Sequence, residues 1–188
     1  MTPGFTTRNM VLASLTVALT TAGAWLRIPF GPVPISLQTL FVLLSGVILG
    51  PFLGAAAMGV YLVLGLVGLP IFAAGGGPGY LFSPTFGFLL SFPLASFTTG
   101  WICRSSEKSD RIRPLRKVGA FCAGTTVVYL VGIPWLALNL FLIQGKTLGT
   151  GTLLMMGLIP FLPGDLVKIV VATLVTGPIR RALREHIP

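Results

Sequence analysis

Long apolar runs, separated by short stretches rich in proline, glycine or charge, are the feature that most constrains this fold. Of the 188 residues, 54% are hydrophobic and only 9% are charged, and the mean hydropathy is +0.93. A helix needs about 20 apolar residues to span the hydrocarbon core of a bilayer. The sequence therefore predicts an all-α integral membrane protein with six transmembrane helices. They form one domain over residues 1–188, with no room for a soluble catalytic lobe.

The expected helices follow from the apolar runs and from the proline and glycine residues between them. The second run is short for a full span, so we expect this helix to be tilted or to cross only part of the bilayer. Residues 150–159 form another short piece, expected to be re-entrant or to lie at the surface. The predicted spans are residues 10–26, 39–49, 53–69, 85–102, 118–143 and a last one starting near residue 164.

Basic residues cluster at the ends of these runs, and the segment 104–117 holds six of the thirteen. With the amino terminus inside, only Arg27 and Lys146 fall on the outer side and Lys168 lies within the membrane. The positive-inside rule therefore predicts cytoplasmic amino and carboxyl termini in a multi-pass protein of the cell membrane. The net charge of +9 then reflects topology and attraction to anionic lipid, and no nucleic acid partner is expected.

The sequence offers no candidate for catalysis or metal binding. Cys103 and Cys122 have no histidine near them in the sequence, so they form no zinc site, and no nucleophile has a positioned base. Residues 145–147 read Gly-Lys-Thr, but Leu140 stands where a phosphate-binding loop requires glycine. We expect a protein that is not an enzyme and that holds no metal and no cofactor.

Asp165 and Lys168 place an acid and a base in an otherwise apolar region. At a spacing of i, i+3 they share a helix face, and Pro163-Gly164 predicts a segment break with Asp165 as the N-cap of the last helix. A charge inside the bilayer costs about 2.5–3.5 kcal/mol, so each needs a partner, a cavity or a ligand. A ligand site is the preferred interpretation, and a structural ion pair is the alternative.

Two loops are expected near this pair, and the second of them carries no charge. Residues 27–38 contain three prolines and present Gln38 at the start of the second span, and residues 68–80 form a glycine-rich lid with Phe72 and Tyr80 as ligand contacts. A solvated glutamine and a flexible connector are the alternatives. About 21 Å of helix separates Asp165 from the inner end of the last span, so all three features converge on one outward-facing pocket. It suits a small molecule with a polar head, an apolar body and a carboxylate that Lys168 attracts.

The first span carries small residues four positions apart, Ser14, Ala18 and Ala22, which allow another helix to approach closely. Internal packing is one interpretation, and a docking face for a partner protein is the other. Residues 22–24 also resemble a signal-peptidase site, but an uncleaved first helix is simpler because further spans follow. Nothing in the chain supplies energy for transport, so we expect a partner that does.

Three stretches, residues 33–44, 65–79 and 160–168, resemble in order the signature segments of the BioY family, the biotin-binding S components of energy-coupling factor (ECF) transporters. The resemblance implies a six-helix subunit that captures biotin from outside. It also implies a transmembrane coupling subunit and two cytoplasmic ATPase subunits as partners. The family's Asp-x-x-Lys pair maps onto Asp165 and Lys168, and its docking motif in the first helix maps onto Ala18 and Ala22.

The chain departs from the family pattern after the glycine loop, where residues 83–88 read Ser-Pro-Thr-Phe-Gly-Phe instead of Gly-Pro-Thr-Gly-Gly-Tyr. Gln38, Phe72 and Tyr80 are therefore predicted from the residues alone. The alternative function is a self-sufficient carrier for biotin or a similar small carboxylate, coupled to protons through Asp165.

Overall fold

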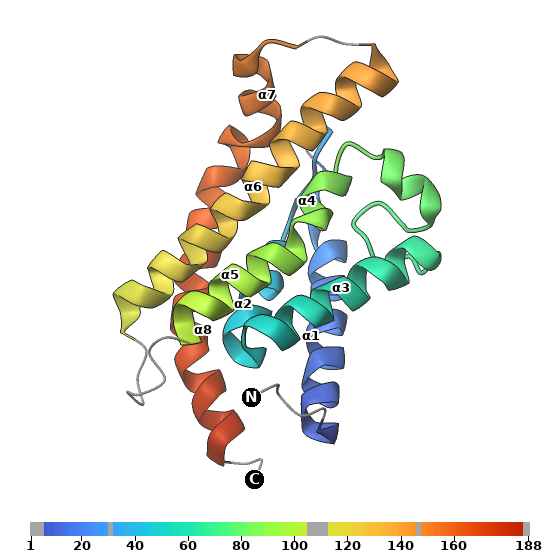
Figure 1. Ribbon diagram of the computed structural model, residues 1–188. Coiled ribbons are helices and arrows are strands. Elements are labelled where there is room, and N and C mark those ends of the chain that lie inside the picture. Colours follow the sequence, from blue (N-terminus) through green and yellow to red (C-terminus); the bar gives the residue numbers. More distant parts are fainter. Residues whose placement is uncertain (1–5, 30–31, 105–112, 146–147, 186–188) are drawn as a thin grey trace.

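The computed structural model describes residues 6–29, 32–104, 113–145 and 148–185. Within these ranges the chain is mostly helical, with one two-stranded hairpin (Figure 1). The elements are α1 (Thr7–Trp25), β1 (Arg27–Ile28), β2 (Ile35–Ser36), α2 (Gln38–Leu49), α3 (Pro51–Val67), η1 (Pro78–Phe82), α4 (Phe86–Leu90), α5 (Phe92–Arg104), α6 (Pro114–Gln144), α7 (Thr150–Gly157), η2 (Ile159–Phe161) and α8 (Leu162–Glu185).

Three helical stretches of the described chain are long and apolar enough to cross a membrane. They are Phe86–Arg104, which joins α4 and α5, Pro114–Ile143 in α6, and Thr150–Leu183, which joins α7, η2 and α8. Helices α2 and α3 are apolar but shorter. The prediction of a mainly helical membrane protein is thus confirmed, whereas the count of six spans and the orientation of the termini stay predictions.

Close approach of α2 and α5 forms the centre of the core. A Cβ atom on Gly46 would lie 2.0 Å from the carbonyl oxygen of Ser96, so only glycine fits at this crossing. The buried hydroxyls of Ser45 and Ser96 hydrogen-bond across the same crossing at 2.8 Å. Each polar group therefore has a partner in a region without water, as buried polar groups require.

The turn between α2 and α3 is tight because of Gly50, whose φ of +83° favours glycine. Pro51 follows at the first position of α3, where its missing N–H is not needed. The third helix therefore begins two residues before the predicted start at residue 53.

The predicted N-cap role of Asp165 is wrong. Helix α8 begins at Leu162, directly after η2, and Asp165 lies inside its first turn. Pro163 does not break the helix because proline is compatible with the first helical turn. The Asp165 carboxylate is consequently available to side chains of other helices.

Both predicted loops contain regular structure in their described residues. β1 and β2 pair in antiparallel fashion, with Arg27 opposite Ser36 and Ile28 opposite Ile35. The glycine loop is held through Tyr61 of α3, whose hydroxyl donates to the carbonyl oxygen of Ile71 at 2.7 Å. It then enters the 3-10 helix η1.

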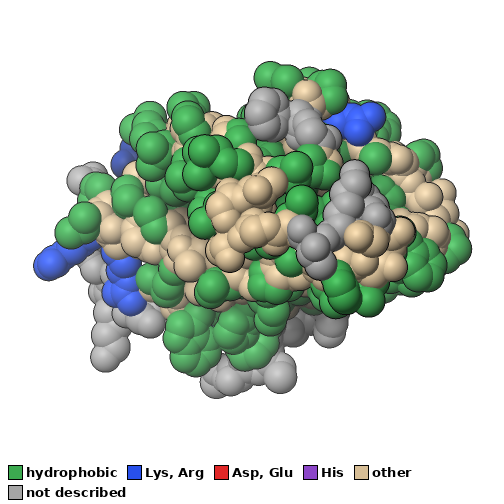
Figure 2. Space-filling view, turned by 90° about the horizontal axis from the view of Figure 1, so that it is seen from above, with side chains coloured by type: hydrophobic (Ala, Val, Ile, Leu, Met, Phe, Trp, Pro, Cys, Tyr) green, Lys and Arg blue, Asp and Glu red, His purple; other side chains and the backbone are tan. Residues whose placement is uncertain are grey.

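Helix α1 begins and α8 ends at the lower end of the molecule in Figure 1, whereas η1, α7 and the end of α6 lie at the upper end. Viewed from that upper end, uncharged side chains cover most of the visible face, and the visible Lys and Arg side chains lie toward its edges (Figure 2). The predicted orientation also depends on Lys108, Arg111 and Lys146, which lie outside the described residues.

Candidate functional site

A pocket lies where two loops meet five helices. The loops are the β1–β2 hairpin and the glycine loop of residues 68–80, and the helices are α2, α4, α5, α6 and α8. The side chains of the pocket surround about 660 Å³ of empty space, a volume that includes space open to the outside. The lining residues are Val33, Pro34, Ser36, Gln38, Thr39, Ala73, Tyr80, Thr85, Phe88, Leu89, Phe92, Thr125, Val128, Tyr129, Gly157, Phe161, Asp165 and Lys168.

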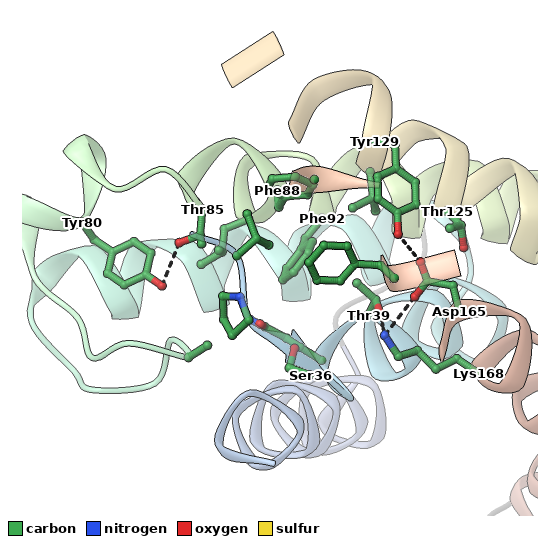
Figure 3. A pocket seen from close by; sticks show the side chains of 18 residues that line it. Ser36, Thr39, Tyr80, Thr85, Phe88, Phe92, Thr125, Tyr129, Asp165 and Lys168 are labelled. Carbon is green, nitrogen blue, oxygen red and sulfur yellow. Dashed lines mark hydrogen bonds and ion pairs between the residues drawn. The ribbon is translucent and has the colours of Figure 1, made fainter. Parts of the chain in front are cut away.

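One end of the pocket carries the predicted charge pair. Lys168 Nζ donates to Asp165 Oδ1 at 2.9 Å and to Thr39 Oγ1 at 3.0 Å, and the Tyr129 hydroxyl donates to Asp165 Oδ2 (Figure 3). Both charged residues are only 7% exposed. An ammonium has three protons and each carboxylate oxygen can accept more than one hydrogen bond. The pair therefore keeps capacity to bind a polar ligand group.

The other end of the pocket carries hydroxyl groups. Thr85 Oγ1 donates to the Tyr80 phenol oxygen at 3.1 Å and lies 2.9 Å from Ser83 Oγ. Figure 3 places Tyr80 and Thr85 far from the charge pair, with Phe88 and Phe92 between the two ends. The pocket thus offers polar contacts at both ends and apolar walls in the middle.

The structure brings four of the five predicted ligand contacts into this pocket: Gln38, Tyr80, Asp165 and Lys168. Gln38 is the first residue of α2, and its amide donates to the Tyr61 hydroxyl at 2.6 Å. This bond links the pocket wall to the residue that holds the glycine loop.

Phe72, the fifth predicted contact, does not line the pocket. Its ring is 1% exposed and packs against Tyr80, with ring centroids 4.7 Å apart. It also covers Gly65, where an added Cβ would lie 2.1 Å from the ring. Phe72 therefore contacts Tyr80, which lines the pocket, without lining the pocket itself.

Sequence reasoning missed Thr39, Thr85 and Tyr129. Thr39 follows Gln38 directly, and it reaches Lys168 because α2 packs beside α8. Tyr129 is a lone phenol in the long apolar α6, and its contact with Asp165 joins residues 36 positions apart. In the sequence, the only indication that Tyr129 belongs to the site is that it is a polar side chain in an apolar span.

The two predicted docking residues lie on the outside of the molecule. Ala18 and Ala22 are exposed on α1, as is Ser14, whereas Thr16 and Thr20 of the same helix are buried. The small-residue stripe therefore does not pack inside the chain, which leaves it accessible to another protein or to lipid.

No group of three or more His, Cys, Asp or Glu side chains that could hold a metal ion occurs among the described residues.

Comparisons with known proteins agree over almost the whole chain. The family model described as "BioY family" matches residues 1–185. A biotin transporter BioY of Rhodobacter capsulatus is 37% identical over 96% of this chain and 95% of the relative. The corresponding protein of Thermotoga maritima is 36% identical over 89% of this chain and 93% of its own length. A probable biotin transporter BioY of Pyrococcus horikoshii is 34% identical with the same coverage.

A solved structure has the same fold. The crystal structure of the S-component for biotin from an ECF-type ABC transporter superposes with a TM-score of 0.80 at 25% identity, covering 96% of this chain and 95% of that one. The match of the family model to nearly the full length confirms the resemblance noted in the three sequence segments, and the apolar helices agree with a multi-pass protein of the cell membrane. The chain belongs to the BioY family.

Proposed function

We propose that this protein is the membrane-embedded capture subunit for biotin uptake. It binds biotin in an outward-facing pocket and delivers it together with an ATP-driven ECF module. That module consists of a transmembrane coupling subunit and two cytoplasmic ATPase subunits. The relatives are biotin transporters and an S-component for biotin, which supports this assignment.

The observation that carries the proposal is the division of the pocket into two polar ends and an apolar middle. Biotin has the same division, because its ureido group and its carboxylate lie at opposite ends of an apolar sulfur ring and alkyl chain. Asp165, Lys168, Gln38 and Tyr80 are the proposed polar contacts, and Phe72 acts through Tyr80. Thr39 and Tyr129 join this set through their bonds to the charge pair.

We place the pocket on the outer side in a topology of six spans with both termini in the cytoplasm. The spans are α1, α2, α3, α4 with α5, α6 and α8. Described basic residues occur at the starts of α1 and α6 and at the ends of α5 and α8. The positive-inside rule puts these ends in the cytoplasm, and the pocket loops lie at the other end in Figure 1.

A test in proteoliposomes separates this proposal from a self-sufficient, proton-coupled carrier. Vesicles with the protein alone and an imposed pH gradient should bind biotin without accumulating it. Vesicles that also contain the coupling and ATPase subunits should accumulate biotin when ATP is supplied. Accumulation by the protein alone, abolished by a protonophore, would favour the carrier and refute the proposal.

A further inference from the structure

Helix α6 holds the hydroxyl end of the pocket through two side chains that do not line it. Trp135 Nε1 donates to the carbonyl oxygen of Ser83 at 3.0 Å, and Asn139 Nδ2 donates to the carbonyl oxygen of Phe82 at 2.7 Å. At a spacing of i, i+4 the two donors share one face of α6. They bind consecutive carbonyl groups of the segment that connects η1 to α4.

This segment places the groups that face the ligand. Tyr80 lies in η1 and Thr85 is the N-cap residue of α4, so the two bound carbonyls lie between the two pocket hydroxyls in the chain. Ser83 also approaches Thr85 through its side chain at 2.9 Å. The position of Phe82 and Ser83 therefore determines where the Tyr80 and Thr85 hydroxyls point.

Packing between α4 and α6 also involves Trp135. An added Cβ on Gly87 would lie 2.1 Å from the Cβ of Trp135, and the Phe86 ring packs edge-on against the Trp135 ring at 5.4 Å. Trp135 thus contacts α4 with its ring and the preceding segment with its N–H group.

Packing alone does not explain why position 139 is an asparagine. The residue is 4% exposed, and its Oδ1 is buried without a partner among the described residues. An unpaired buried amide oxygen is unfavourable, and an apolar side chain of similar shape would avoid that cost. What asparagine provides at this position is the hydrogen bond to Phe82.

We infer that Trp135 and Asn139 are positioning residues for ligand binding, which they promote by fixing the Tyr80–Thr85 hydroxyl pair. The inference rests on the proposed function, because it takes biotin as the ligand. Together with Tyr129, which holds Asp165, these residues make α6 the element that holds both polar ends of the pocket.

The hydrogen bonds from Trp135 to the Ser83 carbonyl group and from Asn139 to the Phe82 carbonyl group form a tether. This tether can be tested without any ligand. Trp135→Phe keeps an aromatic ring and removes the donor, and Asn139→Leu removes the donor and the unpaired oxygen together. In both variants, backbone amides of residues 78–91 should exchange with deuterium faster than in the parent, measured by mass spectrometry on the full protein in detergent. Leu138→Ala, on the exposed side of α6, should leave this exchange unchanged. Parent-like exchange in both variants would overturn the tether.

The binding role is tested by a double-mutant cycle with biotin. Each variant should dissociate biotin roughly 5- to 30-fold faster, as expected for one lost hydrogen bond. In a background carrying Tyr80→Phe and Thr85→Val the effect should shrink to about twofold or less, because the groups that are positioned are gone. In a Lys168→Ala background it should persist in full. Equal effects in both backgrounds would assign Trp135 and Asn139 to general stability and overturn the inference.

The two experiments also separate this inference from the proposed function. If the parent protein fails to bind biotin, the proposed function fails and the binding role inferred here fails with it. The exchange experiment then still decides whether the tether exists.

Discussion

At the scale of residues, the site depends on one buried ion pair with partners on both sides. Lys168 and Asp165 face each other across one turn of α8, and Thr39 and Tyr129 bind them from α2 and α6. A buried charge is tolerated only when it is paired and hydrogen-bonded. Because the pair lies on α8 and its partners lie on α2 and α6, these contacts hold three helices together around the pocket.

Lys168→Ala should weaken the binding of free biotin by roughly 10- to 100-fold, the size of a lost hydrogen bond to a charged group. A biotin amide, which lacks the carboxylate, should lose much less affinity. Both ligands can be compared by calorimetry, with the exposed neighbour Val167→Ala as a control expected to bind like the parent. Equal losses of affinity for both ligands would show that Lys168 does not bind the carboxylate. Lys168 would then act at the ureido group or in the structure.

At the scale of elements, glycine-mediated helix crossings decide how closely the helices approach. Gly46 permits the contact between α2 and α5, and Gly65 provides the space that the Phe72 ring fills. These contacts place the start of α2, with Gln38 and Thr39, beside the glycine loop and α8. The geometry of the pocket is therefore set partly by residues that never touch it.

Gly46→Ala should destabilise the protein, because its Cβ would lie 2.0 Å from the Ser96 carbonyl oxygen. We expect a loss of about 1–3 kcal/mol in the free energy of unfolding, typical of overpacking.

Gly59→Ala in α3 is the matched control, since an added Cβ there meets nothing within 4 Å. Replacing a helical glycine at an open site should stabilise by about 0.5–1 kcal/mol. Thermal unfolding in detergent would measure both, and similar melting temperatures would contradict this account of the crossing.

The sequence predicted helices well because long apolar runs and the Gly50-Pro51 turn are local signals. It also identified Asp165 and Lys168, since charges are rare in an apolar chain. The predictions failed where contacts between residues far apart in the sequence determine the structure. The N-cap prediction for Asp165 was wrong because η2 continues directly into α8, and Phe72 turned inward because Gly65 leaves space for its ring. The Tyr129–Asp165 contact joins two helices and has no local signal.

At the scale of the whole molecule, the described surface is strongly apolar, as a protein surrounded by lipid requires. Leu130, Val67 and Leu174 are each more than 60% exposed on different helices. The proposed function assigns to this chain the capture of the ligand and to partner subunits the supply of energy. The exposed small-residue stripe of α1 is the proposed contact surface for that partner.

Replacing Ala18 and Ala22 with tryptophan should spare biotin binding and abolish ATP-driven uptake. Both side chains are exposed on α1 and lie outside the pocket, so bulky rings there block close helix approach without altering the site. Binding by the purified variant and uptake in vesicles with the complete ECF module would be measured side by side. Tryptophan at Leu15, also exposed on α1, tests whether the effect is specific to the small residues. Normal uptake by the double variant would exclude this docking surface.

The central claim is that the pocket around Asp165 and Lys168 binds biotin. Calorimetric titration of the purified, detergent-solubilised protein with biotin, beside Asp165→Asn, tests it most directly. The parent protein should bind biotin tightly without any partner subunit. In the variant, the Lys168 ammonium loses its buried counter-charge, so binding should be lost or weakened at least about tenfold. No binding by well-folded parent protein, or equal binding by both proteins, would contradict the account.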